Sequence, residues 1–267
     1  MIKLDSIKFK LQSSNLCCYA SNHWNTSILL EPDGFEQVKY ILRQDKIQHI
    51  GLKRVEILPF TQEVIVECSS KILQEQYLDG INKDTIERLS DVVGEYIELS
   101  VYDVADSQLL RADITENLYF PTREEKLSVM RALKLGKSNT GFKVDDWTDK
   151  NGSIVFTGRQ KSYKNRQIYY PKEEELLLAR NKDILSILRS HGVKDIDKIL
   201  RVEQNITSID RLRRAVGMEK GVVTLGDMLS STRKPLLERH IEIMKYADLA
   251  CLFNEDMDII QIRNLVG

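Results

Sequence analysis

The sequence predicts an α+β protein, built on antiparallel β-sheets with helices packed on one face. Three observations lead to this fold class. Several segments alternate apolar with polar residues, which is typical of strands, while others place apolar residues every three or four positions, which is typical of helices. The two kinds do not follow each other in the regular alternation of a parallel sheet. In addition, Asn151-Gly152 lies between two strand-like segments and predicts a tight hairpin.

The N-terminal part of the chain is predicted to consist mainly of strands. Met1 to Gln12 alternates apolar and polar residues and predicts the first strand. Ser13 to Gly34 carries many Ser and Asn residues together with Pro and Gly, and predicts a long irregular loop. Apolar residues recur at helical spacing from Asp84 to about Glu95. The two further strands expected here are Leu52–Leu58 and Glu63–Ser69.

The middle of the chain combines an alternating segment, a capped helix and a hairpin. Leu109 to Thr115 alternates again, with an arginine and an aspartate on its polar face. Thr122-Arg123-Glu124-Glu125 forms a capping box, which predicts a helix that continues to about Leu135. The segments 143–147 and 153–157 flank the Asn-Gly turn and are expected to pair as antiparallel strands.

The C-terminal part is predicted to contain two strands and several helices. Gln167–Tyr170 predicts a strand, which Pro171 should end because proline cannot donate to the sheet. Proline also suits the first turn of a helix, and Lys172 to about Arg189 predicts one. The remaining expected elements are a strand at Ile199–Thr207 and helices at Ile209–Val216, Leu225–Leu229 and Pro235–Leu252.

The total charge gives no sign of a nucleic-acid partner, but one segment is locally basic. The chain is 42% hydrophobic and 30% charged, as in globular proteins, and its formal net charge is -1. Residues 151–172 nevertheless contain no acidic residue. The basic side chains of this segment are Arg159, Lys161, Lys164, Arg166 and Lys172.

Cysteine usage and hydropathy predict a cytoplasmic protein with no membrane partner. The four cysteines have neither a Cys-x-x-Cys pair nor a zinc spacing, and are interpreted as reduced thiols. The N-terminus lacks the apolar run of a signal peptide. No stretch approaches the roughly 20 apolar residues that a membrane-spanning helix needs.

A triplet of arginine, one further residue and an acid recurs on three predicted strands. Because strand side chains alternate between two faces, the arginine and the acid of each triplet share one face. They either form ion pairs on a half-exposed sheet face, or the acids converge on a metal while the arginines approach phosphates. The triplets are Arg54–Glu56, Arg111–Asp113 and Arg201–Glu203.

Tyr169 and Tyr170 lie beside Lys172 at the end of a predicted strand. A phenol, with a pKa near ~10, needs a base or a cation to act as a nucleophile at neutral pH. A phosphodiester under attack needs cations or a Lewis acid to take up charge. Asp113 and Glu203, on polar strand faces, are candidate ligands for such a metal. The alternative is structural, with the tyrosines packed at an interface and the basic hairpin in solvent.

Other common chemistries find no support in the sequence. The four histidines are scattered, without a His-x-His pair or a zinc-protease helix motif. A Walker phosphate loop, a Gly-x-Gly-x-x-Gly loop and a Gly-x-Ser-x-Gly elbow are all absent. Nucleotide hydrolysis, dinucleotide binding and serine-hydrolase chemistry are therefore not expected.

Two long segments contain most of the residues discussed above, namely GSIVFTGRQKSYKNRQIYYPKEEELLLARNKDIL and the later ILRVEQNITSIDRLRRAVG. They resemble segments of the rolling-circle replication initiators of plasmids and filamentous-type phages. Those proteins carry a glycine-basic-serine strand, a Tyr-Asp-Lys type motif followed by acids, and a Leu-Arg-hydrophobic-Glu strand. The upstream LLRADITENL looks like their Arg-x-Asp strand, and SSKILQEQYLDGINKDTIERL looks like a segment of the phage and plasmid branch. The resemblance covers roughly Val64 to Leu229.

This resemblance implies a core of the HUH-endonuclease type that nicks and rejoins DNA. A tyrosine would attack a phosphate at the replication origin, form a 5′-phosphotyrosyl link and free a 3′-hydroxyl, with Mg or Mn polarising the phosphate. Tyr170 matches the tyrosine of the motif and Lys172 its lysine, while Glu203 and Asp113 match the acids of the two strands and would bind the metal. The residues expected to contact DNA are Arg159, Lys161, Lys164, Arg166 and Arg201.

Two departures from the family pattern leave alternatives open. Pro171 stands where the motif has Asp or Asn, and relatives with a two-histidine metal motif place the lysine three residues after the tyrosine, which selects Tyr169. The nucleophile is therefore Tyr170 or Tyr169. The His-x-His motif is also absent, so metal binding would rest on carboxylates.

The resemblance further implies a domain division and partners. The nicking domain is expected at 1–230 and a C-terminal helical extension at 231–267. The expected partners are origin DNA, single-stranded or in a hairpin, together with a host helicase and a second copy of the chain. Two alternatives are a non-catalytic DNA-binding relative, and a mobile-element interaction protein without DNA chemistry.

Overall fold

The computed structural model describes residues 2–12, 23–30, 34–97, 101–135, 142–147, 152–158, 166–232 and 236. The chain forms two compact units. The first unit contains Met1–Asp113 and Thr207–Arg233, and the second contains Ile114–Ile206 and Lys234–Gly267. The first half of strand β6 (Gln108–Tyr119) belongs to the first unit, and its second half belongs to the second unit.

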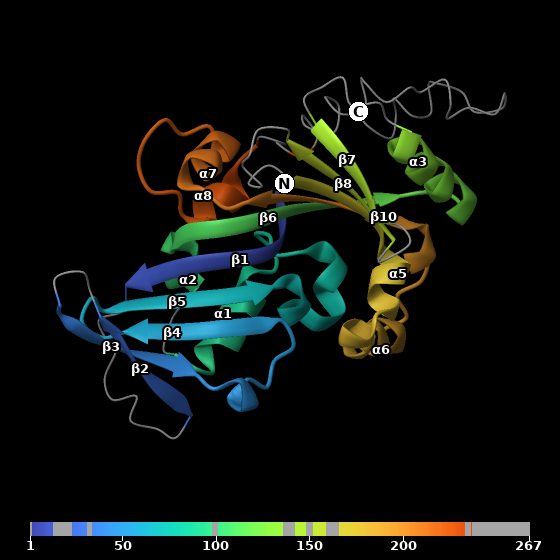
Figure 1. The fold of residues 1–267 in the computed structure, drawn as a ribbon. Coiled ribbons are helices and arrows are strands. Elements are labelled where there is room, and N and C mark those ends of the chain that lie inside the picture. The colour runs from blue at the N-terminus through green and yellow to red at the C-terminus, as the bar shows by residue number, and fades with distance from the viewer. Residues whose placement is uncertain are drawn as a thin grey trace. The chain divides into compact units, whose positions relative to one another are not determined.

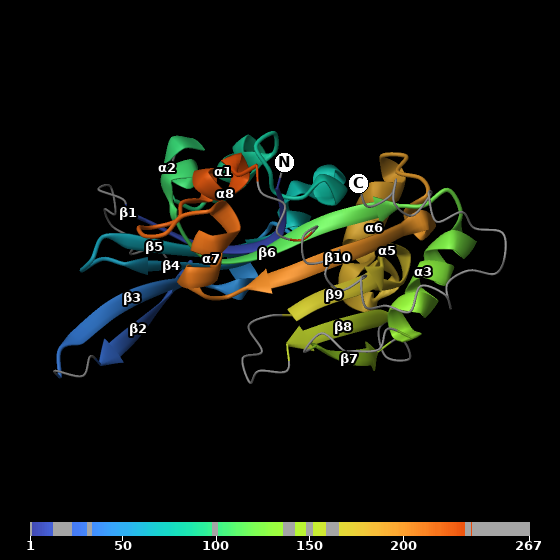
Figure 2. The same cartoon turned by 90° about the horizontal axis from the view of Figure 1, so that it is seen from above.

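The first unit is an antiparallel sheet with helices on one side. Its strands follow the order β2-β3-β4-β5-β1-β6, and Figure 2 shows α1, α2 and α8 on one side of them. Leu4, Ile7 and Phe9 of β1 are fully buried, as are Leu89 and Val93 of α1. The bounds of its strands are β1 Lys3–Gln12, β2 Trp24–Leu30, β3 Glu36–Leu42, β4 Leu52–Leu58 and β5 Glu63–Ser69. Its helices are η1 Gln44–Lys46, η2 Ser70–Asp79, α1 Ile86–Gly94, α2 Val101–Asp106, α7 Ile209–Val216 and α8 Leu225–Ser230.

The second unit continues from the other half of β6. Its strands follow the order β6-β10-β9-β8-β7, and the pairs β7–β8, β8–β9 and β9–β10 are antiparallel. Figure 1 shows α3 and α5 near the end at which β9 passes into α5. The strands are β7 Phe142–Trp147, β8 Ser153–Gly158, β9 Arg166–Pro171 and β10 Ile199–Ile206. The helices are α3 Arg123–Leu135, α5 Lys172–Leu177, η3 Ala179–Asn181, α6 Lys182–Ser190 and η4 Ile196–Lys198.

The α+β class and most of the expected elements are confirmed. The strands Leu52–Leu58 and Glu63–Ser69 and the helix Ile209–Val216 have the expected bounds. The Thr122 hydroxyl caps α3 by accepting from the Glu125 backbone N–H at 3.2 Å, as the capping box requires. The helix expected at 235–252 lies outside the described residues, apart from position 236. Among the described helices, none is long and apolar enough to cross a bilayer.

The long loop expected at Ser13–Gly34 is wrong, because β2 occupies Trp24–Leu30. Asn25, Thr26 and Ser27 are residue types that often form turns, and for this reason their segment was predicted as a loop and not as a strand. Pairing decides its conformation, since every residue of β2 is opposite one of β3, which was not expected either. Strand formation depends on such cross-strand contacts more than on intrinsic preference.

The single helix expected from Lys172 to Arg189 is also wrong. Leu178 has an extended backbone, with φ -61° and ψ 142°, and separates α5 from η3 and α6. The Asn181 side chain donates to the backbone oxygen of Glu175 at 2.7 Å and to its carboxylate at 2.6 Å. A side chain that bonds nearby backbone competes with the helix, and apolar spacing alone does not reveal it.

Cys68 should resist alkylation in the folded protein. Burial in β5 raises the pKa of its thiol to about 12, from 9.0, so the reactive thiolate is scarce. The unfolded chain releases this proton at lower pH than the folded chain does, so the stability that Cys68 contributes falls as pH rises above about 9. Peptide mass spectrometry after iodoacetamide treatment measures the protection. Equal labelling of Cys68 in native and denatured protein would contradict the burial.

Candidate phosphoryl-transfer site

The pairing of β9 with β10 places the two tyrosines on opposite faces of the sheet. Tyr169 is opposite Val202, and Tyr170 is opposite Arg201. Successive strand residues alternate between faces, so only one of the two rings can face the same side as Glu203. Glu203 is two positions along β10 from Arg201 and therefore shares the face of Tyr170.

Tyr169 belongs to the core of the second unit. Its side chain is fully buried and packs edge-on against Phe156 of β8, with ring centroids 5.5 Å apart. Its hydroxyl accepts a hydrogen bond from Gln167 Nε2 at 2.7 Å. A buried phenol with a satisfied hydroxyl is a packing residue.

Tyr170 is half-buried and donates a hydrogen bond to Glu203 Oε1. The two side chains lie diagonally across the strand pair, which is within reach for an aromatic ring and a glutamate. Glu203 is 9% exposed, so little water competes for its carboxylate. A hydrogen bond from a phenol to a largely buried carboxylate is charge-assisted and leaves the acceptor in place to receive the phenol proton.

Lys172 places a cation against the same tyrosine. Its Nζ lies 5.2 Å from the centroid of the Tyr170 ring, within the range of a cation–π contact. The ammonium also donates to Glu175 Oε2 at 2.9 Å, and the side chain is fully buried. The turn at Pro171 makes this possible, because β9 ends there and α5 begins at Lys172. Glu175 was not singled out in the sequence, although an acid three residues after a lysine on a helix is a known pairing signal.

The three arginine–acid triplets do not share one arrangement. Arg54 forms an ion pair with Glu56, and Arg111 Nη2 pairs with Asp113 Oδ2 at 3.1 Å. Arg201 is fully buried, and its Nε donates to Asn117 Oδ1 at 2.8 Å. A side chain without exposed surface cannot touch a DNA phosphate in this conformation, so the structure gives the expected DNA contact of Arg201 no support.

The two expected metal ligands belong to different units of the chain. Asp113 lies in the first unit and accepts from Arg111, while Glu203 lies in the second unit and accepts from Tyr170. Across the part of the chain that the structure describes, no group of three His, Cys, Asp or Glu side chains is arranged to hold an ion. Mg²⁺ and Mn²⁺ take several oxygen ligands. The metal stays a prediction.

Of the five expected DNA-contacting residues, Arg201 and Arg166 lie on the Tyr170 face of the sheet, and only Arg166 of these two has exposed surface. Arg166 of β9 is half-buried, and the strand period puts it on the same face as Tyr170. It lies four positions from Tyr170, about 13 Å along the strand. Arg159, Lys161 and Lys164 lie outside the described residues, so their role stays a prediction.

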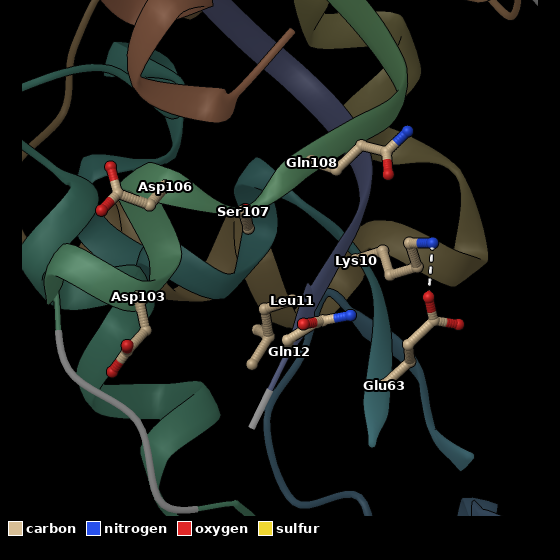
Figure 3. A pocket seen from close by; sticks show the side chains of 8 residues that line it. All are labelled: Lys10, Leu11, Gln12, Glu63, Asp103, Asp106, Ser107 and Gln108. Atoms are coloured by element: carbon tan, nitrogen blue, oxygen red, sulfur yellow. Dashed lines mark hydrogen bonds and ion pairs between the residues drawn. The ribbon is translucent and has the colours of Figure 1, made fainter. Parts of the chain in front are cut away.

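A cavity in the first unit contributes no residue to the tyrosine site. It has a volume of about 370 Å³ and is lined by parts of β1, β5, α2 and the start of β6. Figure 3 shows Lys10 and Glu63 paired in its wall, with Nζ and Oε1 2.6 Å apart, and Asp103 and Asp106 across from them. Its charged groups are thus separate from the residues that the sequence singled out.

The chain was compared with protein families, curated proteins and solved structures. No family model, curated protein or solved structure matches the chain. Tyr170, Glu203 and Lys172 bring a phenol, a carboxylate and an ammonium into contact, and these are the kinds of group that nucleophilic catalysis uses.

Proposed function

We propose that the second unit is the nicking core of a rolling-circle replication initiator, of the HUH-endonuclease type, with Tyr170 as its nucleophile. The observation that carries the proposal is the hydrogen bond from the Tyr170 hydroxyl to Glu203. Tyr169, the sequence's other candidate, is fully buried and its hydroxyl is already bonded to Gln167. The order of sequence motifs that resembles initiators supports the choice of DNA as substrate.

The proposed step exchanges one phosphate ester for another. The Tyr170 oxygen attacks a DNA phosphorus while Glu203 accepts the phenol proton. The bond from phosphorus to the 3′ oxygen breaks, and that oxygen takes a proton from solvent to become a 3′-hydroxyl. The downstream strand remains attached to Tyr170 through its 5′-phosphate. The reverse reaction rejoins the DNA.

Lys172 contributes its positive charge to this step. An ammonium on the ring of Tyr170 stabilises the phenolate that forms as the proton leaves. The ion pair with Glu175 holds the ammonium in place. The metal that the resemblance implies is tested separately in the assay below.

A covalent-adduct assay tests the proposal. The full chain is incubated with a library of single-stranded oligonucleotides of random internal sequence, labelled at the 3′ end, with Mn²⁺ or with EDTA. We expect label to stay with the protein after boiling in detergent, because the 3′ portion of the DNA carries the phosphotyrosyl link. The EDTA arm tests the expected metal. DNA binding without an adduct in either arm would overturn the proposal and favour the non-catalytic relative.

Arg166 should hold the DNA backbone beside Tyr170. Arg166→Ala is expected to weaken binding of single-stranded DNA. A plot of the logarithm of the binding constant against the logarithm of the salt concentration should become less steep by about 0.7, which is the contribution of one phosphate contact. Fluorescence anisotropy at several salt concentrations measures the slope. The control is Arg180→Ala, which removes an exposed cation of the same unit. Equal slopes for the two variants would exclude the contact.

A further inference from the structure

The proposed nucleophile site lies next to the short helix α5, whose position must be stabilised by contacts with other elements. Helix α5 spans only six residues, from Lys172 to Leu177. A helix of this length is not stable alone, so tertiary contacts must fix its position. Lys172 is its first residue, and the position of α5 therefore determines whether the Lys172 ammonium reaches the Tyr170 ring.

Two cations in the first turn of α3 face the acids of α5. Lys126 Nζ lies 3.7 Å from Glu174 Oε2. Arg123 Nη2 lies 3.9 Å from Glu174 Oε1 and 4.0 Å from Glu173 Oε2. Both views in Figures 1 and 2 place α3 and α5 at the same end of β8 and β9. These charges join one helix to the other.

Lys126 differs from Arg123 in burial. The Arg123 side chain is about half exposed, so water screens its ion pairs, whereas Lys126 is fully buried. Within the described residues the Lys126 ammonium has no hydrogen-bond acceptor, and Glu174 is its ion-pair partner. A buried ammonium is costly, and its attraction for a single carboxylate is correspondingly strong.

We propose that Lys126 is a positioning residue for the Tyr170 site. It holds Glu174, Glu174 fixes the first turn of α5, and that turn places Lys172 against the Tyr170 ring. Lys126 touches neither the tyrosine nor the DNA in this scheme. Its catalytic consequence rests on the proposed nicking function, while its effect on Tyr170 ionisation does not.

The adduct assay gives the first test. Lys126→Met should lower the rate constant of adduct formation at saturating DNA about 10-fold to 100-fold, the range for a small displacement of a catalytic group. The affinity for single-stranded DNA should not change. Arg131→Met removes an exposed cation from the same helix and should retain the parent rate. A Lys126→Met rate equal to that control would overturn the proposal.

Titration of Tyr170 gives a second test that does not depend on nicking. The phenolate absorbance of each protein is compared with that of its Tyr170→Phe counterpart. Among the described residues, the charged groups that share the face of Tyr170 or contact Lys172 beside it are Glu203 and Arg201 of β10, Lys172 and Glu175 of α5, and Arg166 of β9. Lys126→Met should move Tyr170 ionisation to higher pH, because the Lys172 cation is displaced while the other groups remain.

These two measurements separate the possible failures. No adduct with the parent protein, together with a higher ionisation pH in Lys126→Met, would reject the proposed function and retain the positioning role. An unchanged ionisation pH would reject the positioning role. A slower rate that follows only the loss of folded protein, measured by circular dichroism, would also reject it.

Discussion

Replacement of Tyr170 by phenylalanine should abolish the covalent DNA adduct while the protein stays folded. The substitution removes only the hydroxyl, which is the attacking atom and the donor to Glu203. Loss of a hydrogen bond to a charged group costs about 1.5–3 kcal/mol of unfolding free energy. The adduct gel and a urea titration measure the two effects.

Tyr169→Phe is the matched control, because it removes the neighbouring hydroxyl. That hydroxyl accepts from Gln167, and its loss should cost about 0.5–1.5 kcal/mol of unfolding free energy. Adduct formation should remain close to that of the parent protein, since the Tyr169 ring lies in the core. The opposite pattern, with an adduct in Tyr170→Phe and none in a folded Tyr169→Phe, would reverse the assignment.

Glu203→Gln should slow adduct formation by about 10²- to 10⁴-fold at neutral pH. The amide keeps the shape of the side chain but cannot accept the phenol proton, and general-base catalysis contributes a factor of this size. Rapid-quench sampling of the adduct gives the rate constant. Single-stranded DNA affinity should stay the same, since Glu203 is 9% exposed and acts on the proton of Tyr170.

Glu116→Gln provides the control for the loss of one carboxylate. Glu116 lies on β6 of the same unit and is exposed. Its variant should form the adduct at the parent rate. If Glu203→Gln also kept the parent rate, Glu203 would not be the base, and its contact with Tyr170 would be structural.

Strands with strong alternation and clear turns could be predicted from the sequence. Met1 to Gln12 alternates apolar and polar residues, and β1 occupies Lys3–Gln12. The Asn151-Gly152 turn correctly predicted the pairing of β7 with β8. By contrast, β2 depends on contacts with β3, and the break at Leu178 depends on the Asn181 side chain, so local patterns did not reveal either one.

The candidate site was predictable only in part. The two-residue period of a strand separates Tyr169 from Tyr170, but it does not say which face meets the core. The packing of Tyr169 on Phe156 settles that point, and Phe156 gave no signal in the sequence. The diagonal contact of Tyr170 with Glu203 requires the register of β9 on β10, and this register is a property of the fold.

The contacts of the arginine–acid triplets were also predictable only in part from the sequence. All three put both side chains on one strand face, as the period requires. In β4 and β6 the two charges pair with each other, as expected for a salt-bridged sheet. Beside β10 the neighbouring strand β9 supplies Tyr170, whose hydroxyl donates a hydrogen bond to Glu203. The neighbouring strand therefore adds a contact to Glu203 that the triplet alone does not predict.

Mass spectrometry of the trapped adduct tests the role of Tyr170 most directly. The adduct is trimmed with nuclease, digested with protease and fragmented to locate the residue that carries the nucleotide. The peptide that contains both tyrosines, Gln167 to Lys172, should carry a nucleotide phosphate on Tyr170. A nucleotide on Tyr169, or on a residue outside this peptide, would contradict the assignment.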